Sequence, residues 1–339
     1  MAPLNIAVIG MGRMGQIYAQ TLHTSVVGAR LFAVVEANPE ALARARALFA
    51  PPHALTSVDE ALALPGLDAV VIASPTSTHA AIVTAAADAG KAIFCEKPLA
   101  LTLADTHAAL AAVSRARVPL QVGFMRRFDA AYQRAATLIA DGRIGTPVTF
   151  KAIGRDPFCP DPAFADPTRS GGLILDMGIH DFDLARWLMG AEVERVSAEG
   201  TLLVCDTLRA VGDIDNACIN LRFTSGALGN VELSRNAFYG YDIRTEVLGS
   251  AGAVLVGRHQ HLPVVLLTRE GAQTDVAPYL QERFGPAYQA QLQHFVECVQ
   301  QGRDPAVGGA DALAAFRIGL AATHSARQSG TPVNLAEFA

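Results

Sequence analysis

Three ionisable side chains interrupt an apolar stretch, GGLILDMGIHDFDLARWLMG, which runs from Gly171 to Gly190. The stretch predicts one buried helix, and Asp176, His180 and Asp183 lie inside it. Burying such groups without partners costs free energy or shifts their protonation, so they either pair with one another or line a cavity. At spacing i, i+4, Asp176 can orient His180. A histidine with a pKa of about 6.5 can accept a proton around neutral pH.

The rest of this stretch separates a polar stripe from an apolar one. Asp183 and Trp187 continue the polar stripe, and a neighbouring apolar stripe forms the core-facing side: Leu173, Met177, Leu184 and Leu188. An intrahelical ion pair of Asp176 and His180 at the protein surface is the alternative to a proton-transfer site.

The segment VIGMGRMG places Gly10, Gly12 and Gly15 in G-x-G-x-x-G spacing, between an apolar strand candidate and a helix candidate. Glu36 closes the next strand at the position that the dinucleotide-binding pattern requires. The glycines permit a tight turn and the close approach of a pyrophosphate to the helix N-terminus. The Glu36 carboxylate suits ribose hydroxyls and repels a 2′-phosphate, so NAD is predicted rather than NADP. A glycine-rich turn without a ligand is the alternative.

The segment SPTSTH, from Ser74 to His79, follows the third strand candidate at its carboxyl end. Open α/β sheets bind ligands at such ends, so its hydroxyl groups are candidates for contact with the nicotinamide ribose. The alternative, which is compatible with the first role, is that Ser77 or Thr78 is the N-cap of the next helix.

The segment CEKPLA, from Cys95 to Ala100, ends the fourth strand candidate. Lys97 stands directly after an apolar strand and before Pro98, whose ring fixes its own φ. We interpret Lys97 as a positioned cation near the cofactor ring. A surface lysine that precedes a helix is the alternative.

Short apolar runs alternate with helical patterns over the first third of the chain. The strand candidates are NIAVIG, RLFAVVE, DAVVIAS, AIFCE and PLQVGF. Runs that are apolar throughout, with helices between them, predict a parallel sheet covered on both faces. We therefore expect an α/β protein whose first domain, residues 1–123, is a doubly wound Rossmann domain.

The pattern changes after residue 123. A helix over 130–140, a Pro- and Asp-rich loop and several alternating strand candidates predict an open, mainly antiparallel sheet, with two helices near 285–301 and 309–329. We expect this second α/β domain, residues 124–339, to bind substrate and to mediate oligomerisation. Large apolar sheet faces are rarely left in water, so a homo-oligomer is expected, a tetramer first and a dimer second.

Composition excludes several classes of partner. Of the 339 residues, 51% are apolar and 17% charged, and the net charge of -5 includes no long basic run that would suit nucleic acid. No apolar run reaches the roughly 18 residues that a membrane span needs. The first residues, MAPLNIAVIG, do not resemble a secretory signal, so a cytoplasmic protein is expected.

The five cysteines are odd in number, and none stands in C-x-x-C spacing. This pattern predicts reduced, mostly buried thiols rather than disulfides. No metal is expected either, because neither the cysteines nor the helix with Asp176 supplies a full ligand set. The pair His259 and His261 lies in a predicted turn and is expected to be solvated.

VIGMGRMG, EKP and the spacing of Asp176 and His180 together resemble the glucose-fructose oxidoreductase / inositol dehydrogenase / MocA family. The resemblance covers essentially the whole chain. Five segments are similar to its inositol 2-dehydrogenase branch: FCEKPLA, LQVGFMRRFDAAY, IHDFDLARWL, YGYDIRTEVLGSAGAV and ERFGPAYQAQLQHFV. The resemblance implies a Rossmann domain followed by an α/β domain with a large open antiparallel sheet that pairs into dimers and tetramers.

The resemblance also implies roles for individual residues. His180 is the general base for a hydroxyl proton, Asp176 orients it, and Lys97 binds the reacting oxygen, where an ammonium stabilises alkoxide character. The residues expected to bind NAD are Gly10, Gly12, Arg13, Met14, Gly15, Glu36, Ser74, Thr76, His79, Glu96 and Lys97. Those expected to contact substrate are Lys97, Arg127, Asp156, Asp176, His180 and Tyr239, with Tyr241 as a further candidate.

The reaction implied is the NAD-dependent oxidation of a secondary hydroxyl of a cyclic polyol, myo-inositol to 2-keto-inositol first. Gly154, Asp156, Met177 and Gly178 depart from familiar inositol enzymes, so a pyranose or another inositol isomer is an alternative. An NAD-dependent glycoside hydrolase of the same fold is another. A third alternative is a non-catalytic regulator that binds NAD, although such a protein would not need Lys97, Asp176 and His180.

Overall fold

The computed structural model describes residues 2–257, 260–269 and 271–338, which form two compact units. The first unit combines residues 1–128 with 286–313, and the second combines 129–285 with 314–339. The late segment 286–313 therefore packs with the first unit. The domain border predicted from the sequence, after residue 123, instead places this segment in the second domain.

The first unit is built on a six-stranded parallel sheet in the order β3-β2-β1-β4-β5-β6. Its strands are β1 (Leu4–Ile9), β2 (Ala29–Val35), β3 (His53–Leu55), β4 (Ala69–Ile72), β5 (Ala92–Cys95) and β6 (Leu120–Val122). Strands β4 and β5 are buried at every position, as expected for strands covered on both faces. The predicted doubly wound Rossmann sheet is confirmed.

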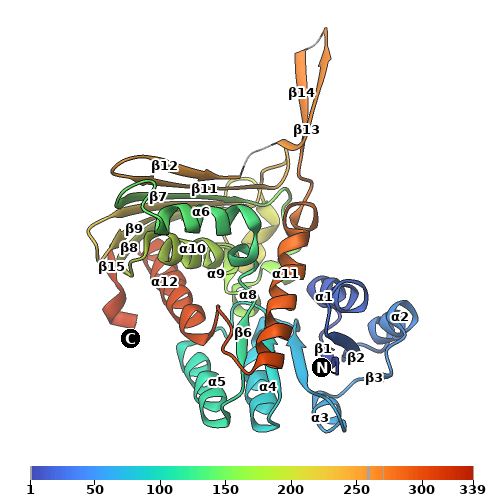
Figure 1. Cartoon of the computed structure of the whole chain (residues 1–339). Coiled ribbons are helices and arrows are strands. Elements are labelled where there is room, and N and C mark those ends of the chain that lie inside the picture. Colours follow the sequence, from blue (N-terminus) through green and yellow to red (C-terminus); the bar gives the residue numbers. More distant parts are fainter. Residues whose placement is uncertain (1, 258–259, 270, 339) are drawn as a thin grey trace. The chain divides into compact units, whose positions relative to one another are not determined.

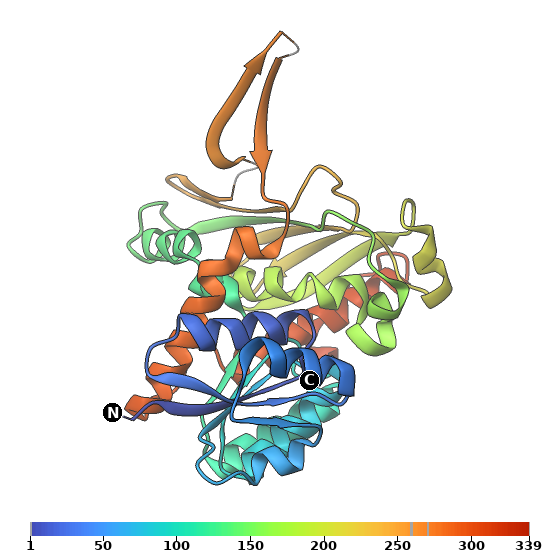
Figure 2. The same cartoon turned by 90° about the vertical axis from the view of Figure 1, so that its right-hand side faces the viewer.

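The helices of the first unit lie on both faces of this sheet (Figure 1, Figure 2). Those within residues 1–128 are α1 (Arg13–Thr24), α2 (Pro39–Phe49), α3 (Val58–Leu62), α4 (Thr76–Asp88) and α5 (Leu103–Ala116), followed by the 3₁₀ turn η1 (Met125–Phe128). Local sequence sets where α2 begins, because Asn38 Oδ1 accepts the N–H groups of Glu40 and Ala41. The short elements β3 and α3 were not predicted, because they are too brief to show a period.

The second unit contains a seven-stranded mixed sheet in the order β12-β11-β7-β10-β9-β8-β15. Its strands are β7 (Pro147–Arg155), β8 (Val193–Thr201), β9 (Asn216–Phe223), β10 (Leu228–Ser234), β11 (Asp242–Gly249), β12 (Ala253–Val256) and β15 (Val333–Asn334). All neighbours are antiparallel except β7 and β10. The predicted large, mainly antiparallel sheet is confirmed. Strands β13 (Gln260–Thr268) and β14 (Gly271–Val276) form a separate hairpin that projects from the unit (Figure 1).

Helices of the second unit gather on one face of the seven-stranded sheet (Figure 1). The remaining helical elements of the chain are α6 (Ala130–Ala140), α7 (Pro162–Ala165), α8 (Pro167–Ser170), α9 (Gly172–Asp176), α10 (Ile179–Met189), η2 (Asp206–Val211), α11 (Leu280–Gln301), α12 (Gly309–Arg327) and η3 (Leu335–Phe338). Along β9, Ala217 and Ile219 are buried while Cys218 and Asn220 are exposed. Within the described ranges, no helix is long and apolar enough to cross a membrane.

The segment 171–190 forms two helices instead of the single helix predicted. Helix α9 ends at Asp176, and α10 begins at Ile179. Gly178 at the junction is closely packed, since a Cβ there would lie 2.9 Å from Leu233 Cδ1 and 3.0 Å from Phe182 Cζ. Tight packing against β10 at this glycine therefore accompanies the break between the helices.

Candidate active site

The turn after β1 has the backbone geometry of a dinucleotide site. Gly10 has φ +89°, and a Cβ there would lie 2.6 Å from Ser74 Cα, so only glycine fits without strain. A Cβ on Gly15 would collide with Gly10 O. Gly12 caps α1 without a side-chain hydrogen bond, which leaves the first-turn N–H groups, including those of Arg13 and Met14, suited to an anion.

Glu36 follows β2, and its carboxylate is held beside this turn. Oε2 accepts the Met11 N–H at 2.8 Å and Oε1 accepts the Asn38 N–H at 2.9 Å. These two amides fix the carboxylate at the end of β2. The residues present therefore fit an adenosine ribose, whose hydroxyls are donors to such a carboxylate.

Ser74, Thr76 and His79 lie where β4 leads into α4. Ser74 Oγ and Thr78 Oγ1 are 2.7 Å apart, and α4 begins at Thr76 with Pro75 as its N-cap. The N-cap alternative for Ser77 or Thr78 is therefore wrong, because the helix starts before them. His79 is buried, with its ring nitrogens 2.8 Å from Pro98 O and Ser74 O. It ties the end of β4 to the segment that follows Lys97.

Lys97 follows β5 and is half-buried, next to a buried carboxylate. Glu96 Oε2 accepts the Lys97 N–H at 3.0 Å, and Glu96 Oε1 accepts the Tyr18 hydroxyl. Gln291 Nε2 donates to the Tyr18 oxygen at 2.8 Å. Burial first, and then the Glu96 charge, raises the pKa of Tyr18 well above its usual range, so the phenol stays a donor. This chain of contacts fixes the backbone that carries Lys97.

Asp176 is the last residue of α9, and His180 lies in the first turn of α10. Both side chains are partly exposed. Arg235 Nη2 lies 3.5 Å from Asp176 Oδ2 and 3.5 Å from Asp213 Oδ2. Sequence reasoning missed Arg235 and Asp213, which are distant from Asp176 along the chain and follow no recognisable motif.

Helix α10 carries a further carboxylate that the sequence analysis did not single out. Asp181 is fully buried, and Asp183 beside it is 1% exposed. Asp181 Oδ2 faces the backbone of β7, since it would lie 3.1 Å from a Cβ on Gly154. In the sequence, only its position directly after His180 could have singled out Asp181. The burial of Asp181 and Asp183 agrees with an ordered polar region on α10 rather than a solvated face.

The candidate substrate residues are spread over both units. Arg127 of η1 donates to Asp311 Oδ1 at 2.9 Å within the first unit. In the second unit, Asp156 follows β7, and its backbone pairs with Ser234 O and with the Ala237 N–H.

The two tyrosine candidates lie in the second unit. Tyr239 donates to Asp242 Oδ2 and accepts from Arg155 Nη1, each at 2.8 Å. Burial raises the pKa of Tyr239. Tyr241 packs edge-on against Tyr279 and Phe284. Whether these residues bind substrate stays a prediction.

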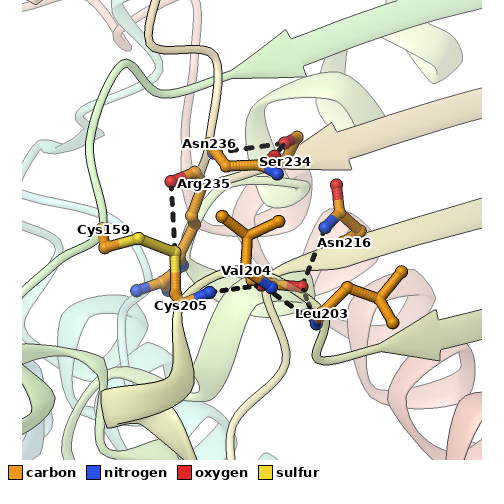
Figure 3. Close-up of a disulfide and its surroundings, with 9 residues drawn as sticks. Cys159, Leu203, Val204, Cys205, Asn216, Ser234, Arg235 and Asn236 are labelled. Atoms are coloured by element: carbon orange, nitrogen blue, oxygen red, sulfur yellow. Dashed lines mark hydrogen bonds between the residues drawn. A yellow bond between two sulfur atoms is a disulfide. The ribbon is translucent and has the colours of Figure 1, made fainter.

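The prediction that all cysteines are reduced is wrong for one pair (Figure 3). Cys159 and Cys205 form a disulfide with a Cα–Cα distance of 5.5 Å, while Cys95, Cys218 and Cys298 are free. The two partners are separated by 46 residues, and tertiary structure alone brings their loops together. Cysteine spacing could not reveal a single bridge of this kind.

A buried carboxylate orders the loop next to this bridge. Asp215 accepts the N–H groups of Leu203, Val204 and Cys205 at 2.6 to 3.2 Å, and its charge is further stabilised by Asn216. Burial acts to raise the pKa of Asp215, but these hydrogen bonds outweigh it and lower the pKa. No group of His, Cys, Asp or Glu in the described ranges could hold a metal ion; His259 lies outside them.

Comparison with known proteins agrees with this geometry. The family model described as an oxidoreductase family with an NAD-binding Rossmann fold matches residues 4–124. A second model, the GFO/IDH/MocA C-terminal domain, matches residues 132–255. The chain belongs to the GFO/IDH/MocA family of oxidoreductases, and its first unit is an NAD-binding Rossmann domain.

Relatives of known or assigned activity match nearly the full length of the chain. The scyllo-inositol 2-dehydrogenase (NAD(+)) of Bacillus subtilis is 43% identical, covering 97% of this chain and 95% of the relative. The myo-inositol 2-dehydrogenase of Thermotoga maritima is 40% identical, covering 95% and 96%. Scyllo-inositol dehydrogenase from Lactobacillus casei, solved with NAD(H) and scyllo-inositol, superposes with a TM-score of 0.93 at 28% identity, covering 98% and 99%.

Proposed function

We propose that this protein oxidises a secondary hydroxyl of an inositol ring to a ketone, with NAD as the hydride acceptor. The observation that carries the proposal is the near-complete match to inositol 2-dehydrogenases, at up to 43% identity among those named above. The geometry supports it, because the chain holds a dinucleotide turn in one unit, and Asp176 and His180 at the adjoining ends of α9 and α10 in the other. Lys97, at the end of a parallel strand, completes the set of catalytic candidates.

Each catalytic candidate has one task in this proposal. His180 accepts the proton of the reacting hydroxyl, and Asp176 orients the imidazole. Lys97 donates a hydrogen bond to the same oxygen and stabilises the negative charge that develops there. Bound NAD supplies the acceptor for the hydride that leaves the hydroxyl-bearing carbon. The products are a ketone, NADH and one proton, so atoms and electrons balance.

Substrate hydroxyls are assigned to polar groups from both units. We place Arg127, Asp156 and Tyr239 in this role, with Tyr241 as a further candidate. Arg127 and Tyr239 are already oriented by Asp311 and by Asp242. Side chains held in this way can read the axial or equatorial position of a hydroxyl with little loss of entropy.

Formation of NADH on a substrate panel tests the reaction. Absorbance at the NADH band is followed with myo-inositol, scyllo-inositol, other isomers and pyranoses, each with NAD and with NADP. We expect NADH formation with at least one inositol. Turnover on a pyranose alone would contradict the substrate class. Cleavage of a glycoside without net NADH would support the hydrolase alternative.

We also propose a homotetramer formed by copies of this chain. The hairpin β13–β14 exposes four consecutive apolar side chains, Val264 to Leu267, and Leu267 is 76% exposed. The uncovered face of the seven-stranded sheet adds Leu248 and Leu255. Exposed apolar surface of this extent favours association.

Light scattering at micromolar concentration tests the assembly. We expect a mass of four chains for the wild type and a smaller assembly for the double variant Leu266→Asp/Leu267→Asp. Leu48→Asp, at an exposed leucine of α2 in the other unit, is the matched control and should leave the mass unchanged. A monomeric wild-type mass would contradict the proposal.

A further inference from the structure

Arg235 is a fully buried cation shared by two carboxylates. It follows β10, is 1% exposed, and its Nη2 lies 3.5 Å from both Asp176 Oδ2 and Asp213 Oδ2. Its side-chain nitrogens have no hydrogen-bond partner among the described residues. Burying a guanidinium with such incomplete hydrogen bonding is unfavourable unless nearby charges compensate it. The two carboxylates are therefore the groups that hold the Arg235 charge in place.

The backbone around Arg235 is anchored independently of its side chain. The Arg235 N–H donates to Asp215 O at 2.9 Å, and Arg235 O lies 3.5 Å from the disulfide sulfur of Cys205 (Figure 3). The Asp215 carboxylate in turn binds three consecutive amides that end at Cys205. The guanidinium therefore extends from a fixed point toward α9.

Helix α9 is held at both of its ends by this arrangement. Asp213 Oδ1 accepts the Leu173 N–H at 3.1 Å in the first turn, and Arg235 contacts Asp176 at the last residue. Burial raises the pKa of Asp213, which the Arg235 charge opposes. Asp176 thus lies at the end of a short helix that is contacted by a cation and an anion from outside the helix.

We propose that Arg235 is a positioning residue, which holds Asp176 in place as a carboxylate and, with Asp213 as its second anion, sets the basicity of His180. The inference rests on the proposed function, because it acts through the Asp176–His180 pair. Removing a nearby cation raises the pKa of an imidazole, and removing a nearby anion lowers it. Loss of the Arg235 charge and loss of the Asp213 charge must therefore shift the pKa of His180 in opposite directions.

The variants are Arg235→Met, which removes the charge at similar length, Arg235→Lys, which keeps it, and Asp213→Asn. Arg209→Met, at an exposed arginine of η2, is the matched control. Besides His180, whose pKa is the readout, the elements packed against α9 carry other ionisable groups that no variant substitutes: Arg169 on α8, Asp181, Asp183 and Arg186 on α10, Asp215 before β9, Arg222 on β9 and Glu232 on β10. A shift is thus attributable to the substituted residue.

Two measurements are made on the full-length protein. The first is kcat and KM against pH with NAD and a substrate from the panel. The second is the rate at which diethyl pyrocarbonate modifies His180 across pH, resolved by peptide mass spectrometry, which needs no substrate. We expect Arg235→Met to lower kcat roughly tenfold to a hundredfold, as loss of a supporting partner typically does. The acidic limb of the profile of kcat against pH should move to higher pH in Arg235→Met and to lower pH in Asp213→Asn. Arg235→Lys should recover most of kcat.

The outcomes separate this inference from the function on which it rests. Unchanged kcat and pH profiles in Arg235→Met would overturn the inference. So would shifts of the same sign in Arg235→Met and Asp213→Asn. If Arg235→Met does not fold, Asp213→Asn still reports the sign of the shift, and a move of its acidic limb to higher pH would overturn the inference. Wild-type turnover in His180→Ala would overturn the proposed function itself, and the role of Arg235 with it.

Discussion

Glu36 in the first unit and Asp176 in the second are both carboxylates of candidate sites, but different kinds of contact position them. Glu36 accepts the backbone N–H groups of Met11, which follows β1, and of Asn38, which precedes α2. Asp176 contacts a side chain, Arg235, that enters from β10 and is itself anchored through Asp213 and Asp215. The candidate cofactor site is therefore supported by backbone amides, and the candidate catalytic site by long-range side-chain contacts.

This difference predicts which parts of the protein tolerate substitution. A backbone amide is present whatever residue stands at its position, so the support of Glu36 persists through most substitutions. The support of Asp176 depends on the identity of individual side chains. Substitutions in the second unit should thus affect turnover from a distance, whereas those around Glu36 should affect NAD binding only when they alter the glycine turn or Glu36 itself.

The largest effect is expected from His180. His180→Ala should lower kcat by roughly 10²-fold or more, because it removes the general base. NAD affinity, read by fluorescence titration, should be retained, since the dinucleotide turn belongs to the first unit. Lys97→Ala should also lower kcat, and the two losses should be less than additive. His107→Ala, at an exposed histidine of α5, is the control, and wild-type turnover in His180→Ala would contradict the assignment.

A smaller effect is expected from Glu36. Glu36→Ala should weaken NAD binding by about tenfold to a hundredfold, as expected for loss of charged hydrogen bonds worth about 1.5–3 kcal/mol. The preference for NAD over NADP should fall as well, because the charge that repels a 2′-phosphate is removed. Glu40→Ala, at an exposed position of α2, should change neither quantity. Unaltered cofactor preference in Glu36→Ala would show that the carboxylate does not face the ribose.

The smallest effect is expected from Asp215, which tests the long-range support of the second unit. Asp215→Asn should lower the free energy of unfolding by about 2 kcal/mol at pH 7, since an amide accepts more weakly than a carboxylate. The pKa of Asp215 is lowered from 3.8 in the folded protein, so this stability is present above pH 3.8 and is lost as pH falls through the lower, folded value.

Urea unfolding at several pH values measures this effect. The difference in the free energy of unfolding between wild type and Asp215→Asn should be constant around neutral pH and should become smaller below pH 3.8. Asp206→Asn, at an exposed aspartate of η2, is the control and should unfold like the wild type. An unchanged difference at acid pH would mean that the Asp215 charge does not stabilise the loop 203–205.

Much of the fold was predictable from the residues, because its signals are local. The apolar runs that became β1, β2, β4, β5 and β6 are continuous, and the runs in the second unit alternate. Such patterns report burial on two faces or on one, whatever the distant partners are. The break between α9 and α10 was not predicted, because the packing of Leu233 against Gly178 that accompanies it joins segments far apart in the sequence.

For this protein, the sequence alone determined the features that depend on interactions between residues close together in the chain. These are the glycine turn after β1, the acidic residue after β2, the lysine after β5 and the spacing of Asp176 and His180. Tertiary structure decided the disulfide of Cys159 and Cys205, the return of residues 286–313 to the first unit, and the placement of Arg235 between Asp176 and Asp213. The physical reason is range: backbone geometry and periodicity act between neighbours, whereas a buried ion pair or a bridge exists only after distant segments have packed.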